Sequence, residues 1–375
     1  MNRIEKTLEE LSASGNLRAI PGDTAAGLVD LSSNDYLGLA VRDDLRDAFL
    51  GECGGRLPLM TSSASRLLAG SQSSYDRFES LLRDLYGAPA LTFNSGYHAN
   101  TGLVSSLADR STLIVADRLV HASIIDGIKL SGAPFVRFRH NDYDHLEKIL
   151  VDKGRDYNEI LIIAESVYSM DGDRADIGRL VDIKRSTPGA MLYIDEAHAV
   201  GVEGRHGLGM VEDAGLVGDV DVIVGTLGKA LASVGAYAVV SPLIRRFVVN
   251  KARSLIFSTA LPPVNMLWSA FIMERVPSMT AERDRLRSLG RRLAAILRLD
   301  RSSHIAPLVV GNPRDAVALS ARLADEGFKV LPIRVPTVPP GTDRLRFSLS
   351  AALDPRDLDR LEETLERLRP CATNS

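Results

Sequence analysis

A single lysine stands shortly after an apolar run, in the stretch VDVIVGTLGKA that ends at Ala230. A lysine in this place can hold a phosphate, lie on the surface, or form an imine with an aldehyde. A nucleotide phosphate loop is excluded, because Ala230 and Ile223 stand where that loop needs a hydroxyl residue and a glycine. An amine that forms imines must be partly neutral near pH 7, which burial and nearby positive charge achieve. Lys229 is therefore our candidate for covalent binding of an aldehyde.

The aldehyde cofactor pyridoxal phosphate requires a carboxylate at its ring nitrogen, so that the ring stays protonated and can accept electrons. Asp195 ends the apolar run that begins at Met191, and it is placed for this role. His121 follows another predicted strand and can lie flat against the ring. Ser169 or His198 can bind the ring hydroxyl.

The phosphate of such a cofactor needs hydrogen-bond donors. Gly96 and Tyr97 follow Ser95 at a predicted helix start, where backbone N–H groups and the helix dipole favour an anion. Thr226 supplies a hydroxyl group, and Ser258 and Thr259 offer two more.

These residues are spaced along a chain in which short β-rich runs alternate with amphipathic helical patterns. Such alternation predicts an α/β fold with a mostly parallel sheet that helices flank on both faces. Chemistry in these sheets gathers at the carboxyl ends of the strands, where the candidate residues lie. The predicted strands are Ala90–Asn94, Thr112–Ala116, Phe135–Phe138, Ile160–Glu165, Met191–Asp195, Val220–Thr226 and Ala236–Val240.

The pattern of predicted helices and strands changes after about Pro262 and indicates a smaller α+β domain at the C-terminal end. A long helix is expected over Ala281–Leu299, followed by strands at Ile305–Val310, Phe328–Ile333 and Arg344–Ser350. We expect an N-terminal helix and arm over residues 1–48, a large cofactor-binding domain over 49–272 and the small domain over 273–375.

Composition excludes several classes of function. The net charge is -3 and the pI is near 6.2, so no basic field attracts nucleic acid. No apolar run approaches the roughly 18 residues of a membrane span, and Cys53 and Cys371 suggest neither disulfides nor a metal site. No secretion signal is visible at the N-terminus, so we expect a cytoplasmic protein.

Two further motifs point away from metal and dinucleotide chemistry. The stretch from His140 to His145 holds no ligand pair at a zinc spacing, and Asp142 is predicted to cap a helix instead. Gly207–Glu212 ends in Glu where a dinucleotide fingerprint needs Gly or Ala. We therefore expect no metal.

Seven motifs, in order along most of the chain, resemble those of the α-oxoamine synthases, which are fold-type I pyridoxal-phosphate transferases. They are LSSNDYLGL (Leu31–Leu39), FNSGYHAN (Phe93–Asn100), DRLVHAS (Asp117–Ser123), ESVYSMDGD (Glu165–Asp173), IDEAHAVGVEGRHGLG (Ile194–Gly209), TLGKAL (Thr226–Leu231) and PTVPPGTDRLRFSLSA (Pro336–Ala351).

The resemblance implies roles for individual residues. Lys229 is expected to bind the cofactor and then to remove the α-proton of an amino acid. Arg346 is expected to grip the amino-acid carboxylate with help from Asn34, although strand alternation puts Arg344 on the same face and does not choose between the two. Two residues match positions that contact substrate in similar enzymes, namely Arg18 and Thr337.

Within the family, the chain is most similar to members that condense L-alanine with a pimeloyl thioester, carried on coenzyme A or acyl carrier protein, in biotin biosynthesis. Members that use glycine and a short acyl-CoA, a simple aminotransferase and a non-catalytic cofactor-binding regulator stay open as alternatives. Two departures from the family pattern, in Met60–Gly70 and at Tyr75, bear on the acyl substrate. The resemblance also implies a homodimer whose active site lies at the interface, with Ser258 and Thr259 reaching the neighbouring phosphate.

Overall fold

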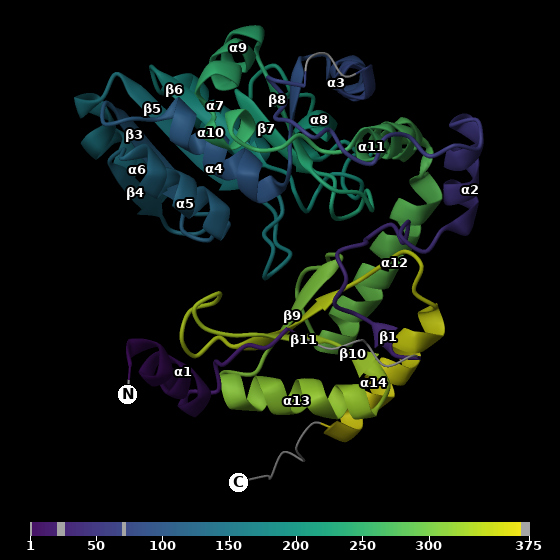
Figure 1. The fold of residues 1–375 in the computed structure, drawn as a ribbon. Helices are drawn as coiled ribbons and strands as arrows, with labels where there is room; N and C mark the ends of the chain where they lie inside the picture. The colour runs from purple at the N-terminus through teal and green to yellow at the C-terminus, as the bar shows by residue number, and fades with distance from the viewer. Residues whose placement is uncertain (1, 21–26, 70–72, 369–375) are drawn as a thin grey trace. The chain divides into compact units, whose positions relative to one another are not determined.

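The computed structural model describes residues 2–20, 27–69 and 73–368 (Figure 1). Contacts within the chain divide it into two units. Unit 1 comprises Met1–Tyr36, Ser169–Asp173 and Asp284–Ser375, and unit 2 comprises Leu37–Tyr168 and Arg174–Arg283. The domain bounds expected from the sequence stay a prediction, and Cys371 lies outside the described residues.

Unit 2 is built on a seven-stranded sheet in the order β2-β8-β7-β6-β5-β3-β4. Only β8 runs against the others, because it pairs antiparallel with both β2 and β7. All seven strands expected from the sequence are confirmed, with ends that differ by no more than two residues. They are β2 (Ala90–Phe93), β3 (Thr112–Asp117), β4 (Phe135–Phe138), β5 (Glu159–Glu165), β6 (Ala190–Asp195), β7 (Val222–Thr226) and β8 (Ala236–Val240).

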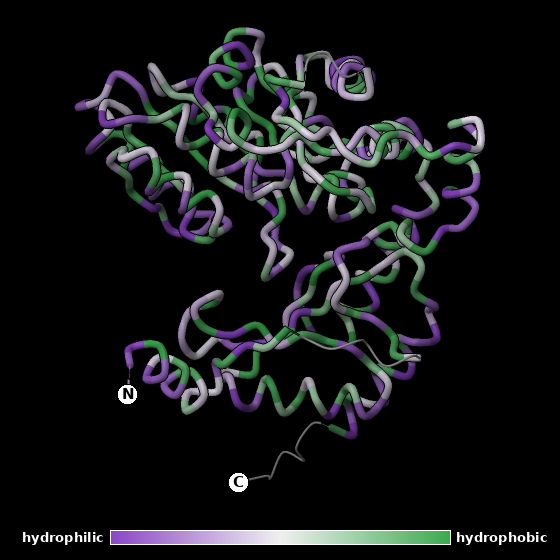
Figure 2. Tube along the Cα trace, in the orientation of Figure 1, coloured by the Kyte–Doolittle hydropathy of each residue, from purple (hydrophilic) through white to green (hydrophobic). Residues whose placement is uncertain are grey.

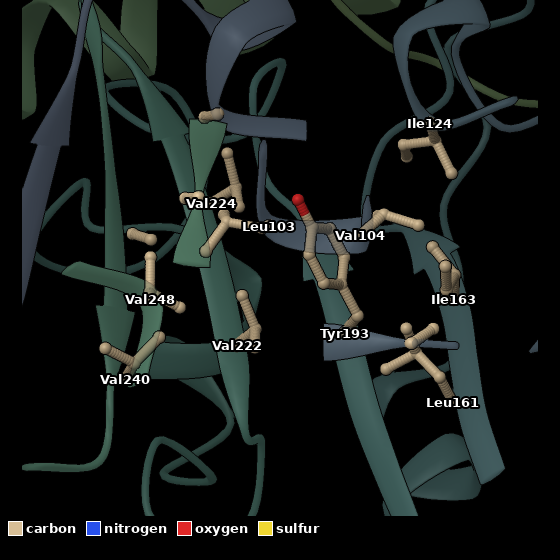
Figure 3. Close-up of a cluster of buried hydrophobic side chains, with 14 of the residues drawn as sticks. Leu103, Val104, Ile124, Leu161, Ile163, Tyr193, Val222, Val224, Val240 and Val248 are labelled. Atoms are coloured by element: carbon tan, nitrogen blue, oxygen red, sulfur yellow. The ribbon is translucent and has the colours of Figure 1, made fainter. Parts of the chain in front are cut away.

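The sheet is apolar on both faces, as sheets covered on both sides are. Its central strands are the hydrophobic interior of unit 2 in Figure 2. One face packs against helices that contribute Leu103, Val104, Ile124 and Val248, and the Tyr193 ring lies among these residues (Figure 3). Three other helices, α3, α6 and α7, also contact the sheet and add no residue to this cluster.

The helices of unit 2 begin at sequence signals that position the candidate residues. Ser95 caps α4 by accepting a hydrogen bond from the His98 N–H, and His121 caps α5. Asp142 caps α6, which confirms that prediction. The helices are α2 (Asp43–Glu52), α3 (Ser73–Tyr86), α4 (Gly96–Leu107), α5 (Ala122–Ser131), α6 (Tyr143–Lys153), η1 (Gly154–Asp156), α7 (Ile177–Ser186), α8 (Met210–Asp213), α9 (Pro242–Lys251), α10 (Arg253–Ile256), α11 (Pro263–Arg275) and η2 (Val276–Ser278).

Unit 1 contains a three-stranded antiparallel sheet, β11-β12-β9, and a two-stranded parallel pair, β1-β10. The long helix α12 runs from unit 2 into unit 1, close to its expected bounds. The elements are α1 (Arg3–Ala13), β1 (Val29–Asp30), α12 (Thr280–Leu297), β9 (Ile305–Val309), α13 (Pro313–Asp325), β10 (Phe328–Lys329), β11 (Leu331–Ile333), β12 (Arg344–Ser348) and α14 (Pro355–Leu368). None of the described helices has both the length and the apolar composition that crossing a bilayer requires.

One strand expected from the sequence, Phe328–Ile333, is wrong as a single element. It is two strands that meet at Val330, because β10 pairs with β1 while β11 pairs with β12. The change of pairing strand interrupts the hydrogen-bond ladder, and the spacing of apolar residues in the sequence does not reveal this interruption.

A five-residue excursion, Ser169–Asp173, belongs to unit 1 although the chain on either side of it belongs to unit 2. Gly172 has a φ of +68°, and a β-carbon there would lie 2.2 Å from the carbonyl oxygen of Ile305. Only glycine allows this close approach, so the excursion packs tightly against the start of β9.

Candidate active site

Lys229 lies in the turn that follows β7. Its side chain is half-buried, and Nζ lies 2.7 Å from Nε2 of the buried His198, which follows β6. Backbone hydrogen bonds shape the turn, since Leu227 N donates to the Gly235 oxygen at 2.9 Å and Ala232 N donates to the Lys229 oxygen at 2.9 Å. The fold therefore presents one lysine amine at the carboxyl end of the sheet, next to an imidazole.

Asp195 is the last residue of β6 and is only 4% exposed. Its Oδ1 accepts a hydrogen bond from the Ala197 N–H at 2.9 Å, and its Oδ2 accepts one from Asn100 Nδ2 at 2.8 Å. Both donors are neutral, so the carboxylate is held in place while its negative charge stays available to a cation.

His121 lies at the start of α5, after β3. Its backbone N–H donates to Glu165 Oε1 at 2.5 Å, and its Nδ1 lies 2.7 Å from Ser123 Oγ. The ring is solvent-accessible, yet the surrounding protein removes enough water to lower the pKa of His121 below its usual value, against the opposing effect of Asp195. A lowered pKa keeps the imidazole neutral near pH 7.

The N-terminus of α4 and the end of β7 adjoin each other. A β-carbon at Gly96 would lie 3.8 Å from Thr226 Oγ1, and Thr226 is 8% exposed. Tyr97 is 49% exposed, and its hydroxyl donates to Asp126 Oδ2 at 2.7 Å, a hydrogen bond that raises the pKa of Tyr97. Backbone N–H groups at this helix start have no partners within their own helix.

The segment around Ser258 and Thr259 lies beside the loop that departs from the family pattern. Thr259 forms a β-bridge with Ser65, and its carbonyl oxygen accepts a hydrogen bond from Asn94 Nδ2 at 2.6 Å. The Tyr75 ring is buried under the Arg66 guanidinium, 3.9 Å from its ring centre. Gly70, the last residue of the departing stretch, lies outside the described residues.

These groups fit pyridoxal phosphate by their chemistry. Unit 2 offers a partly buried amine for the aldehyde, a buried carboxylate for the ring nitrogen and a neutral imidazole for the ring face. The start of α4, where Gly96 has no side chain and the Thr226 hydroxyl lies nearby, suits the phosphate of the cofactor. Among the residues that the structure describes, no cluster of three or more His, Cys, Asp or Glu side chains is arranged to hold a metal ion.

Unit 1 distinguishes the two arginines of β12. Arg344 pairs with the Asp171 carboxylate, so its charge is neutralised within the protein. Arg346 is 8% exposed, and its partners are neutral: the Ser169 carbonyl oxygen at 2.5 Å, Asn34 Oδ1 at 3.2 Å and the Tyr36 hydroxyl at 3.4 Å. A buried guanidinium with only neutral partners is the better candidate for binding a carboxylate, as the family pattern predicts for Arg346.

The remaining candidates of unit 1 fall into two groups. Arg18 and Thr337 are exposed and in contact, because Arg18 Nη2 donates to Thr337 Oγ1 at 3.1 Å. Ser169 offers its backbone oxygen to Arg346. Its expected role at the ring hydroxyl stays a prediction.

Four buried residues next to the predicted ones were not singled out by sequence reasoning. Their roles depend on contacts between distant segments of the chain. The sequence held one indication for Tyr193, because Tyr193 and Asp195 are two residues apart in β6 and so share a face of the strand. The four are Asn100, Ser123, Glu165 and Tyr193.

Comparisons with known proteins agree with this geometry. A family model described as aminotransferase class I and II matches residues 26–365. A putative 8-amino-7-oxononanoate synthase of Pasteurella multocida is 46% identical over 97% of this chain and 98% of its own length. The 8-amino-7-oxononanoate synthase of Chlorobaculum parvum is 48% identical over 98% of each chain.

Solved structures show the same similarity in three dimensions. A serine palmitoyltransferase from S. paucimobilis, with PLP and myriocin bound, superposes with a TM-score of 0.87 at 29% identity over 97% of this chain and 96% of that one. An 8-amino-7-oxononanoate synthase from Francisella tularensis superposes with a TM-score of 0.76 at 28% identity over 90% and 96% of the two chains.

Proposed function

Because this chain belongs to the α-oxoamine synthases, within the aminotransferase class I and II family, we propose that it makes 8-amino-7-oxononanoate from L-alanine and a pimeloyl thioester. Identity of 46–48% over nearly the full length of two relatives with this activity in their names carries the proposal. In the reaction, the α-carbon of alanine loses its carboxylate as carbon dioxide and bonds to the acyl carbonyl carbon, while the thiol of coenzyme A or acyl carrier protein leaves. This is a step of biotin biosynthesis, and we infer a cytoplasmic location.

Pyridoxal phosphate, when bound, supplies an electron sink for the negative charge that develops on the α-carbon. Lys229 would hold the cofactor through its amine and would take the α-proton of the amino acid on Nζ. The 2.7 Å contact with His198 Nε2 fixes where that amine lies. Asp195 keeps the cofactor ring nitrogen protonated, and its neutral partners leave its charge for this purpose.

The other residues position the reactants. Arg346 binds the carboxylate of the amino acid together with Asn34, which orients the α-carbon. His121 stacks on the ring, and Gly96, Tyr97 and Thr226 hold the phosphate. For the acyl thioester, Arg18 and Thr337 offer a guanidinium and a hydroxyl that already contact each other.

We also infer that the enzyme is a homodimer. Five apolar residues in one segment of unit 2 are 50% to 81% exposed, which supports their burial against a second copy of this chain, and Ser65 of the same segment bridges to Thr259. The five are Leu57, Leu59, Met60, Leu67 and Leu68. Light scattering during size exclusion tests this, and a monomer that retains full activity would contradict it.

A substrate panel tests the reaction. The purified protein, loaded with pyridoxal phosphate, is supplied with alanine, glycine or serine and with pimeloyl, succinyl, acetyl or palmitoyl thioesters, while carbon dioxide and free thiol are measured. We expect alanine with a pimeloyl thioester to give the highest kcat/KM. Glycine with a short acyl-CoA as the best pair, or serine with palmitoyl-CoA, would assign the chain to another branch of the family. Accumulation of pyridoxamine phosphate would indicate an aminotransferase.

A further inference from the structure

Two buried polar residues, Asn100 and Ser123, link the carboxylate of Asp195 to the imidazole of His121, and a third, Tyr193, bonds to Asn100. Tyr193 donates from its hydroxyl to Asn100 Oδ1 at 2.6 Å. Asn100 Nδ2 in turn donates to Asp195 Oδ2 at 2.8 Å and to Ser123 Oγ at 2.9 Å. Asn100 is 2% exposed, and Tyr193 and Ser123 are fully buried.

The orientation of the Asn100 amide follows from these contacts. Burial raises the pKa of Tyr193, so its hydroxyl is protonated and needs an acceptor. The amide oxygen of Asn100 is that acceptor, which turns both hydrogens of the amide nitrogen toward Asp195 and Ser123. A flipped amide would set its oxygen against the carboxylate, where two acceptors would repel each other.

The same logic fixes the tautomer of His121. Ser123 Oγ accepts a hydrogen from Asn100, so its own hydrogen is directed to His121 Nδ1, 2.7 Å away. The Ser123 backbone N–H also points at this nitrogen, at 3.3 Å. Nδ1 therefore accepts hydrogen bonds, and the proton of a neutral ring must sit on Nε2.

We propose that Asn100 is a positioning residue, which holds the Asp195 carboxylate directly and, through Ser123, keeps His121 in the tautomer with its proton on Nε2. Tyr193 sets the orientation of the Asn100 amide. This inference rests on the proposed function, because it assumes that Asp195 and His121 hold the cofactor. It adds a cause to that function: one amide aligns two ring-binding groups, Asp195 at the end of β6 and His121 after β3.

The first test measures the imidazole nitrogens without any substrate. ¹⁵N NMR of histidine-labelled protein, free of cofactor, reports which ring nitrogen carries the proton, and a His121→Gln variant assigns the signals. We expect His121 protonated at Nε2 in the wild type. In Asn100→Ala and Ser123→Ala a mixture of tautomers is expected, because the hydroxyl is then free to turn or is missing. A wild-type ring protonated at Nδ1 would overturn the proposal.

The second test measures cofactor affinity by titrating the cofactor-free protein with pyridoxal phosphate. We expect Asn100→Ala to weaken binding by about tenfold to a hundredfold, since a buried carboxylate loses one of its two neutral donors. Tyr193→Phe is expected to weaken binding less, because the amide remains but its orientation is no longer fixed. Ser105→Ala, five residues further along α4, is the matched control and should leave both the affinity and the tautomer unchanged.

The outcomes separate this inference from the proposed function. If the wild type fails to join alanine to a pimeloyl thioester but the tautomer and affinity results hold, only the proposed function falls. If the wild type has that activity while Asn100→Ala and Ser123→Ala keep the wild-type tautomer and affinity, only this inference falls. Should Asn100→Ala not fold, Ser123→Ala and Tyr193→Phe decide the question with the same two measurements.

Discussion

The amine of Lys229 lies 2.7 Å from Nε2 of His198, although the two residues come from turns after different strands. The contact joins the end of β7 to the end of β6 at the edge of the sheet where Asp195 also lies. The position of the amine is therefore set by two neighbouring strand ends.

Replacing Lys229 by alanine removes the group that we propose to bind the cofactor and to move the α-proton. We expect turnover to fall by about a thousandfold or more, in line with the loss of a proton-transferring side chain. The visible absorption of covalently bound cofactor should be absent as well. Spectra and thiol release of Lys229→Ala and of Lys251→Ala, an exposed lysine of α9, provide the measurement and its control. Full turnover in Lys229→Ala would remove this residue from the mechanism.

The two arginines of β12 should respond differently to substitution. Arg346→Lys loses a bidentate partner for a carboxylate, so we expect the KM for the amino acid to rise by about tenfold to a hundredfold. The KM for the thioester should change little. Arg344→Lys retains a charge beside Asp171 and should leave the KM for the amino acid within about threefold of wild type. The reverse order of effects would exchange the two roles.

The buried carboxyl group of Glu196 is expected to make the stability of the protein depend on pH. It is fully buried, and burial raises its pKa to about 8, against the effect of hydrogen bonds from the Val211 and Met210 N–H groups. Between about pH 4.5 and pH 8 the folded protein holds a proton that the unfolded chain releases. Stability therefore falls as pH rises through this window, by up to about 1.4 kcal/mol per pH unit.

Glu196→Gln cannot ionise, so its free energy of unfolding should lack this slope. Urea unfolding at pH 6 and pH 8.5 measures the difference, with the exposed Glu366→Gln as a control. Equal slopes for Glu196→Gln and wild type would show that Glu196 does not titrate in this window.

Glu79 should matter more for stability than exposed carboxylates do. Its two oxygens accept hydrogen bonds from Arg66 at 2.8 Å and Arg245 at 2.9 Å, and the backbone N–H of Thr92 donates to it at 3.0 Å. Glu79 is 8% exposed, and Glu79→Ala removes the acceptor that these three donors share, so we expect a loss of about 3 kcal/mol. Glu274→Ala breaks an exposed pair and should cost no more than about 1 kcal/mol. Urea unfolding compares the two, and equal losses would contradict the expectation.

The strands and caps were predictable because their signals are local. Runs of apolar residues bounded by turns gave all seven strands of the main sheet, and Asp142 carries its own capping chemistry. Ionisable residues at strand ends pointed to Lys229, Asp195 and His198 for a similar reason, since parallel strands share an edge, and the structure places all three at that edge.

What escaped sequence reasoning depends on contacts across the chain. Alternation put Arg344 and Arg346 on one face and left the choice to the family pattern; the structural difference between them is the Asp171 carboxylate, which comes from 173 residues away. The role proposed for Asn100 depends on its hydrogen bonds with Tyr193 and Ser123, which are 93 and 23 residues away in the sequence. The periodicity of apolar residues in the sequence does not reveal contacts of this kind.

Because of the excursion Ser169–Asp173, no single continuous segment of the chain contains all of unit 1. Unit 1 is assembled from three stretches of the chain, one of them spliced between β5 and α7 of the other unit. A fragment that begins at Asp284 would carry Arg344 and Arg346 but would lack Asp171, the Ser169 carbonyl and Asn34. Neither dissection by proteolysis nor transplantation of the C-terminal segment into another enzyme can therefore transfer Arg346, the arginine proposed to bind a carboxylate, with its surroundings intact.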